Sequence, residues 1–272
     1  MPGRIFTALL LAAGIALPGI AAAQLVFAVT EGVTYQATPK EIREKFEPIA
    51  EAIGKALRRD VRVVLVPAYD DARAGLAKQE FDIAFVHPAH VALAEVKAGR
   101  YRSVAWTSSF TDYTVSILAK GDTPMKAFGD IRGRTLVTPD PDSITAVMVR
   151  AMLRGEKFGA KDLVVRTTRY QDAVPFYIDN GFADVGATAA RAVVKSWTDK
   201  GGKVLVKSKS VPIKQVIASA KLPAEDVERI RETLLALGNS DAGRKALAPS
   251  GYKGFQAPDP ALEAASIAWL GL

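Results

Sequence analysis

The sequence contains no cysteine and only two histidines, His87 and His90. The absence of cysteine excludes disulfides, thiolate metal sites, iron–sulfur clusters, a cysteine nucleophile and the lipidated cysteine of bacterial lipoproteins. After residue 23 no apolar run approaches the roughly 20 residues that a membrane-spanning helix needs, so we expect no stable membrane insertion. Basic residues nowhere cluster with interleaved aromatic residues, so we expect no nucleic-acid partner.

Several sequence motifs of enzymes are also missing. The patterns G-x-x-x-x-G-K-[ST], G-x-G-x-x-G, G-x-S-x-G and H-E-x-x-H do not occur, which removes the usual signatures of nucleotide hydrolysis, dinucleotide redox chemistry and zinc proteolysis. A triad of Ser143, His87 and an aspartate stays open, because triads form in space and not along the sequence. We expect a protein that is not an enzyme and has no cofactor.

The overall composition is that of a globular protein. The chain has 272 residues, of which 49% are hydrophobic and 24% are charged, and this length suits one large or two small domains. Lys and Arg number 36 against 29 Asp and Glu, giving a net charge of +7. The summed field therefore favours anionic partners.

The first residues have the pattern of a signal peptide. Arg4 lies in a short basic start, an apolar run covers residues 6–20, and small residues follow up to Ala23. This order is typical of a segment that a signal peptidase removes. We expect cleavage near Ala23, a mature chain that begins at Gln24, and an exported protein.

Apolar periodicity predicts alternating strands and helices in the first half of the chain. Short apolar runs at 25–29, 61–66 and 81–86 are typical of buried strands. Between the first two runs, apolar residues recur at spacings of four and three from Pro39 to Leu57, as in an amphipathic helix. Strands that alternate with helices indicate an α/β fold with a largely parallel sheet.

A second α/β unit comes next, with strands expected at 135–137, 163–167 and 183–186 and a helix at 143–153. The segments 119–122 and 208–215 are the expected crossovers between the two units, and they would act as hinges. We therefore predict a signal peptide over 1–23, a first lobe formed by 24–119 plus 216–272, and a second lobe formed by 120–215.

The segment 138–146 lies between a predicted strand and a predicted helix. Backbone N–H groups at a helix start, the helix dipole and the hydroxyls of Ser143 and Thr145 can together hold an oxyanion without Lys or Arg. Ordinary capping of the helix by Ser143 explains the same residues. The segment alone leaves both interpretations open.

Other candidate ligand-binding residues lie after predicted strands. His87 lies at the carboxyl end of a strand, where α/β sheets bind ligands, and is expected to donate a hydrogen bond. A metal-binding receptor that uses His87 and His90 is the alternative, although Pro88 argues against a shared helical face. Glu31 and Thr34 lie in a loop after the first strand and could face the same site.

Three tyrosines that begin elements or come after turns, Tyr69, Tyr113 and Tyr170, could close over a ligand or simply pack with a wet hydroxyl.

Several motifs in order carry a family resemblance. The mature chain resembles the phosphonate/phosphite/phosphate-type periplasmic solute-binding proteins of ABC transporters. The resemblance rests on a first strand and loop and on five further segments: 43–49 (REKFEPI), 81–88 (FDIAFVHP), 113–118 (YTVSIL), 140–145 (DPDSIT) and 183–187 (ADVGA). It implies a type II two-lobe α/β fold with two hinge crossovers, and a periplasmic location.

The resemblance also implies site residues. Ser143, Ile144 and Thr145 match the helix start that holds the oxyanion in this family, and Tyr113 and Tyr69 match pocket aromatics. This sequence departs from the family pattern in four ways: Ile144 replaces a hydroxyl residue, His87 replaces a glycine, Tyr170 replaces a histidine, and Arg191 and Lys214 align near acidic positions. Those cations would repel an ammonium group and favour a plain or more anionic oxyanion.

The function implied is that of a receptor for a tetrahedral oxyanion of the phosphate, phosphite, phosphonate or arsenate class. Lobe closure would deliver the anion to an ABC permease. Signalling to a membrane histidine kinase is the alternative that keeps the same binding chemistry. The two alternatives differ only in the membrane partner.

Overall fold

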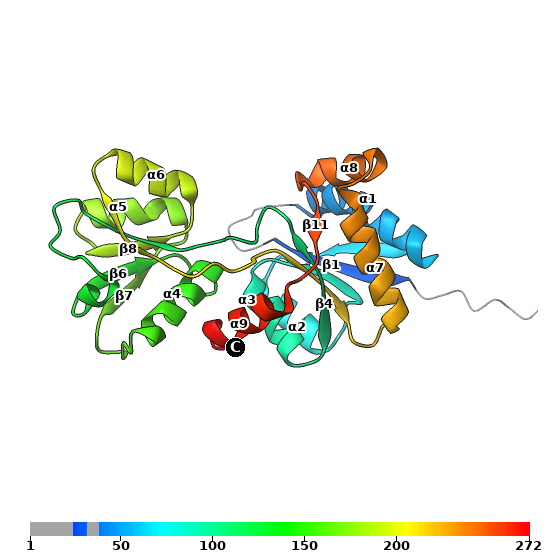
Figure 1. Cartoon of the computed structure of the whole chain (residues 1–272), viewed down its shortest axis with the longest axis horizontal. Coiled ribbons are helices and arrows are strands. Elements are labelled where there is room, and N and C mark those ends of the chain that lie inside the picture. The colour runs from blue at the N-terminus through cyan, green and yellow to red at the C-terminus, as the bar shows by residue number, and fades with distance from the viewer. Residues whose placement is uncertain (1–23, 32–37) are drawn as a thin grey trace, which may run out of the picture.

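The computed structural model describes residues 24–31 and 38–272, and the predicted signal peptide lies outside them. The chain forms two α/β lobes, each built on its own sheet, with two long crossovers between them (Figure 1). The predicted fold class, a two-lobe α/β architecture, is confirmed.

The first lobe contains a six-stranded sheet of order β11-β4-β10-β3-β1-β2. The strands β1, β2 and β3 are parallel, and β10 runs antiparallel to both β3 and β4. The strands are β1 (Leu25–Thr30), β2 (Val61–Leu65), β3 (Ile83–Val86), β4 (Tyr101–Thr107), β10 (Gln215–Ser219) and β11 (Phe255–Gln256). The helices are α1 (Pro39–Leu57), α2 (Tyr69–Ala77), α3 (Ala89–Lys97), α7 (Ala224–Leu237) and α8 (Asp241–Leu247), with a 3-10 turn η3 (Ala248–Ser250).

Helix α1 shows how the sequence determines these elements. Thr38 and Glu41 form a reciprocal capping box, and Pro39 occupies the first turn. The predicted apolar face, which includes Ile42, Phe46 and Ile49, is fully buried in the core of the first lobe. The periodicity that predicted the helix therefore also fixes which face packs on the sheet.

The second lobe contains a five-stranded sheet of order β7-β6-β8-β5-β9. Its strands are β5 (Ser116–Ala119), β6 (Thr135–Thr138), β7 (Val164–Thr167), β8 (Val185–Thr188) and β9 (Lys203–Lys207). Its helices are α4 (Ile144–Gly155), α5 (Val174–Asp179) and α6 (Arg191–Asp199), with 3-10 turns η1 (Phe128–Ile131) and η2 (Gln171–Ala173). In β8, a Cβ on Gly186 would lie 2.4 Å from Val174, so this glycine lets α5 pack on the sheet.

The two lobes join their parallel strands by the same hydrogen bonds. In the first lobe, the Asp82 carboxylate accepts from Val26 N–H at 2.8 Å, and Asp82 N–H donates back to the Val26 carbonyl. In the second lobe, Asp184 and Thr135 form the same reciprocal pair at 2.8 and 2.9 Å. The aspartates of the two motifs at 81–88 and 183–187 therefore fix strand register in both lobes.

The chain passes between the two sheets twice. The second crossover runs between β9 and β10, over residues 208–214, where 208–215 was expected. The first runs between β4 and β5, over residues 108–115, because β5 pairs with β8 and β9 in the second sheet. The hinge predicted at 119–122 is therefore wrong, and β5, which the range 24–119 placed in the first lobe, lies in the second.

The C-terminal helix α9 (Pro260–Leu270) lies between the lobes, against α3 of the first and α4 of the second (Figure 1). Leu270 packs in one apolar cluster with Leu93 of α3 and Met148 of α4. The predicted first-lobe range 216–272 therefore ends in a helix that both lobes share.

None of the helices within 24–31 and 38–272 combines the length and the apolar character needed to cross a membrane.

Candidate functional site

The start of α4 carries the predicted helix-start motif. Ser143 is the N-cap, and its side-chain oxygen accepts from Ala146 N–H at 3.2 Å. This geometry is ordinary capping, yet it leaves the hydroxyl proton of Ser143 free to be donated. The N–H groups of Ile144 and Thr145 belong to the first turn, which has no acceptors of its own within the helix. The same turn can therefore be capped and still bind an anion.

Tyr113 lies in the first crossover and reaches the start of α4. Its hydroxyl is 2.7 Å from Thr145 Oγ1 and accepts from Gln171 Nε2 at 3.2 Å. Burial raises the pKa of Tyr113, and the two hydrogen bonds oppose that shift only in part, so the phenol stays protonated. The predicted pair Tyr113 and Thr145 is brought together, although Thr145 itself is fully buried.

Gln171, which begins η2, was not predicted. Its side-chain oxygen accepts from Ala189 N–H at 2.6 Å and from the Thr188 hydroxyl at 3.2 Å, so its amide nitrogen must point toward Tyr113. A single glutamine beside a predicted tyrosine carries no distinctive sequence signal. Its importance emerges only when β8 and the first crossover are placed together.

Two residues next to this network lie apart from it. Ile144 is buried in the apolar core of the second lobe, so its side chain belongs to packing and only its backbone can face a ligand. Tyr170 is 39% exposed, and the Arg169 guanidinium lies 5.3 Å from its ring centroid. The structure gives Tyr170 no bond to the Tyr113 network within the described residues.

Glu31 lies in a buried ionic cluster of the first lobe. Its carboxylate accepts from the Tyr252 hydroxyl and forms ion pairs with Lys214 at 3.7 Å and Lys45 at 3.4 Å. The Lys214 ammonium also lies 4.5 Å from the ring centroid of Phe110, and burial lowers its pKa. Both carboxylate oxygens of Glu31 therefore have partners within the protein, and these partners offset the cost of burying the charge. Thr34, predicted to lie in the same loop, falls outside the described residues.

His87 comes directly after β3 and is anchored to the second crossover. Its Nδ1 lies 3.0 Å from the Ile213 carbonyl, which only accepts, so Nδ1 carries the proton. Desolvation lowers the pKa of His87 to about 4, and the hydrogen bond to Ile213 opposes that shift. The predicted hydrogen-bond donor therefore donates to the backbone of the second crossover.

His90 lies on the first turn of α3, where its ring is buried. Neither ring nitrogen has a hydrogen-bond partner in the described part of the chain, and desolvation lowers its pKa to about 4. Across residues 24–31 and 38–272, no three His, Asp or Glu side chains gather as a group that could hold a metal ion. The geometry gives the His87 and His90 metal alternative no further ligands among these residues.

Tyr69 is the first residue of α2 and is buried. One turn later, Arg73 lies 5.9 Å from the Tyr69 ring centroid and forms an ion pair with Asp142 at 3.2 Å. Asp142 immediately precedes Ser143. This pair brings the predicted first-lobe aromatic and the predicted second-lobe helix start to the same interface.

Arg191 begins α6 and lines a groove of about 950 Å³ beside the crossovers. Its side chain is 81% exposed and forms an ion pair with Asp112 at 2.8 Å. Lys195, Lys207 and Tyr113 line the same groove, so it is positively charged and adjoins the Tyr113 network. Arg191 therefore lies near the network without contacting the start of α4 directly.

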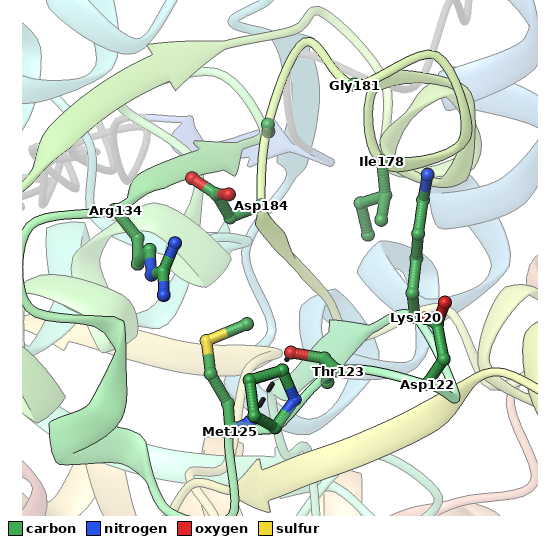
Figure 2. A pocket seen from close by; sticks show the side chains of 10 residues that line it. Lys120, Asp122, Thr123, Met125, Arg134, Ile178, Gly181 and Asp184 are labelled. Atoms are coloured by element: carbon green, nitrogen blue, oxygen red, sulfur yellow. Dashed lines mark hydrogen bonds between the residues drawn. The ribbon is translucent and has the colours of Figure 1, made fainter.

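A second hollow of about 310 Å³ lies in the second lobe near the starts of β6 and β8. Arg134 and Asp184 lie on one side of it, Lys120 and Asp122 on the other, and Met125 between them (Figure 2). It opens at the amino ends of these strands, whereas Ser143 comes after the carboxyl end of β6. This hollow is therefore separate from the candidate anion site.

Solved structures with the same fold span nearly the whole chain. A Xanthomonas citri protein bound to ATP has a TM-score of 0.74 at 14% identity, covering 91% of this chain and 97% of its own. A Prochlorococcus marinus protein in complex with methylphosphonate has a TM-score of 0.64 at 12% identity, with coverages of 91% and 97%. A binding protein component of an ABC phosphonate transporter from Pseudomonas aeruginosa has a TM-score of 0.60 at 17% identity, with coverages of 91% and 85%. At these identities the likeness shows the fold.

None of the curated protein sequences compared with the chain matches it significantly. A family model does: residues 32–262 match the one described as "ABC transporter, phosphonate, periplasmic substrate-binding protein". This match covers most of the chain, and it confirms the family that the sequence motifs resemble. The chain belongs to the periplasmic substrate-binding proteins of ABC phosphonate transporters, a family of transport proteins and not of enzymes.

Proposed function

We propose that this chain binds a tetrahedral oxyanion of the phosphonate, phosphite, phosphate or arsenate class at the start of α4, and delivers it to an ABC permease when the lobes close. The observation that carries the proposal is the arrangement around Ser143, where a free hydroxyl proton, a helix start and the held hydroxyl of Tyr113 lie at one place.

The donors at this place are neutral. The Ser143 hydroxyl and the N–H groups of Ile144 and Thr145 would donate to the anion, and the positive end of the α4 dipole supports them. A hydrogen bond to a charged group contributes about 1.5–3 kcal/mol. A few such bonds suffice for micromolar affinity, which corresponds to about −8 kcal/mol. No lysine or arginine has to lose its hydration to bind the ligand.

Tyr113 would supply a further donor. Gln171 donates to its oxygen, and the fully buried Thr145 hydroxyl can donate to the same oxygen. When Gln171 and Thr145 both donate to the Tyr113 oxygen, the proton of the Tyr113 hydroxyl points away from them and can be donated to another group. Tyr113 lines the groove beside the crossovers, where that proton can meet a ligand.

Delivery is a consequence of the two-lobe architecture. An anion that contacts both lobes favours the closed arrangement in proportion to its extra contacts there. The two crossovers at 108–115 and 208–214 are the segments about which the lobes would move. The family description names an ABC transporter, which favours a permease over a histidine kinase as the membrane partner.

Calorimetric titration of the chain from Gln24 onward tests the binding step. The panel is phosphate, phosphite, arsenate, methylphosphonate, 2-aminoethylphosphonate and phosphonoacetate. We expect one of these anions to bind tightly and Ser143→Ala to weaken it about tenfold or more, because a charge-assisted hydrogen bond is lost.

Ser240→Ala is the matched control. Ser240 caps α8 in the first lobe and accepts from Gly243 N–H at 3.0 Å, as Ser143 does from Ala146. Both variants lose a helix cap at a similar cost of about 1 kcal/mol, but only Ser143→Ala should change affinity. Equal affinities in the two variants would refute the site, and failure of folded, ligand-free protein to bind any anion of the panel would refute the function.

A further inference from the structure

An ion pair connects the two lobes beside the proposed anion site. Arg73 extends from α2 of the first lobe, and its guanidinium lies 3.2 Å from the carboxylate of Asp142 in the second. The same guanidinium holds Asp70 of its own helix at 3.0 Å. Arg73 therefore reaches across the interface while it stays tethered to α2.

The backbone of the segment that carries Asp142 is held in place by its own lobe. Arg150 of α4 donates to the Pro141 carbonyl at 2.9 Å, and the Asp142 N–H donates to Asp140 at 2.8 Å. Asp142 thus places a negative charge one residue before the helix cap.

A carboxylate at this position opposes the proposed function. The start of α4 is argued to hold an anion with neutral donors, and an unpaired negative charge beside it would repel that anion. The backbone that carries Asp142 is held by the bonds described above, so the residue stays next to Ser143. Its charge has to be balanced in place, and among the described residues Arg73 is the cation paired with it.

We propose that Arg73 is a specificity-determining residue that acts from the first lobe: it offsets the negative charge of Asp142 and so lets the start of α4 accept a doubly charged oxyanion. The inference rests on the proposed function. Repulsion from a fixed charge grows with the charge of the ligand. The pair therefore matters more for a dianion, such as methylphosphonate in mildly alkaline buffer, than for a monoanion such as methanesulfonate.

The effect is expected to be moderate, because the two side chains are 37% and 53% exposed and solvent screens them. Arg73→Ala should weaken the dianion about three- to tenfold and the monoanion by no more than about twofold. Because the Debye length shortens as salt is added, the loss should shrink at high ionic strength.

Calorimetry with methylphosphonate and methanesulfonate, at low and high salt, compares the wild type with Arg73→Ala and with the double variant Arg73→Ala/Asp142→Asn. The double variant should recover the lost affinity, since no unbalanced carboxylate remains next to Ser143. Arg73→Ala/Asp70→Asn should not recover it, because Asp70 lies on α2 and not before Ser143. Arg62→Ala, which removes an exposed arginine from β2, is the control for net charge.

The outcomes separate the two proposals. Wild type that binds neither these probes nor the phosphate-class panel overturns the proposed function, and with it this inference. An Arg73→Ala variant that binds methylphosphonate as tightly as the wild type overturns the inference alone. Loss of affinity that Asp142→Asn does not restore also overturns it, because Arg73 would then act by contacting the ligand itself. A double-mutant cycle on urea unfolding without ligand reports whether the two side chains are coupled at all.

Discussion

The two lobes join their parallel strands in the same way, but they differ in the segment after an inner strand of each sheet. After β1 the chain places a buried carboxylate, Glu31, between two lysines and a tyrosine. After β6 it places Ser143 at the start of α4, with the hydroxyls of Thr145 and Tyr113 beside it. One lobe buries a carboxylate among cations that pair with it, and the other presents neutral donors.

This difference suggests that the two lobes have different roles, one in binding the anion and the other in holding distant segments together. Neutral donors on a helix that is packed in a core are already oriented, and they bind an anion without the cost of stripping water from a cation. The charges of the first lobe instead hold segments that are distant in sequence, namely the second crossover through Lys214 and the C-terminal part through Tyr252. The first lobe would then be the frame, and the second the anion holder.

The largest expected effect is a loss of stability when the ionic cluster of the first lobe, the proposed frame, is broken. Glu31→Ala should lower the free energy of unfolding by about 3–5 kcal/mol, because it leaves the buried ammonium of Lys214 without its carboxylate. Lys45→Ala removes the more exposed partner of the same carboxylate and should cost about 1 kcal/mol or less. Urea unfolding monitored by circular dichroism measures both.

Equal losses in Glu31→Ala and Lys45→Ala would contradict the idea that the buried pair carries the effect. A Glu31→Ala protein that stays folded but no longer binds any anion would contradict the division between frame and holder, since it would place Glu31 among the ligand contacts.

A second, smaller effect concerns the buried histidine of the frame. The pKa of His90 is lowered to about 4, chiefly by desolvation. Between about pH 4 and pH 6.5 the unfolded chain binds a proton at this residue and the folded chain does not, so acid favours unfolding in this range. We expect His90 to account for up to about 3 kcal/mol of stability that is present at pH 7 and lost as the pH falls to 4.

His90→Leu tests this expectation, because neither ring nitrogen has a partner in the described chain for the substitution to break. The variant should keep its stability at pH 7 and lose less of it between pH 6.5 and 4.5. Urea midpoints across this range give the comparison, and His87 is unchanged in both proteins. Parallel pH curves for the two proteins would show that His90 does not titrate as described.

The fold could be predicted because its signals are local. The periodicity between Pro39 and Leu57 gave α1 together with its buried face, and short apolar runs gave the central strands. The first crossover was misplaced for the opposite reason. Residues 113–119 form one continuous extended run in the sequence, and only the pairing of β5 with β8 shows where the second lobe begins.

The candidate site was predictable in part. The motifs indicated Ser143 and Tyr113 as candidates, whereas Gln171 and Arg73 were not predicted, because each contacts a partner far away in the sequence. Gln171 binds Tyr113 across 58 positions, and Arg73 reaches Asp142 across 69. The burial of Glu31 was not predicted for the same reason, since its partner Tyr252 is 221 positions away. Sequence alone does not show that a loop carboxylate is buried when the groups that bury it are so distant.

The smallest effect tests whether α9 belongs to both lobes. Arg154 of α4 donates to the carbonyls of Trp269 and Leu270 at 3.1 and 2.6 Å, at the carboxyl end of α9 where a cation is favourable. Arg154→Ala should lower stability by about 1 kcal/mol at most and should speed hydrogen exchange at residues 267–272. Arg229→Ala, which breaks an exposed ion pair within α7, is the control. If exchange at 267–272 is unchanged, the hydrogen bonds from Arg154 do not hold α9, and the apolar packing of Leu270 with Leu93 and Met148 keeps the helix in place.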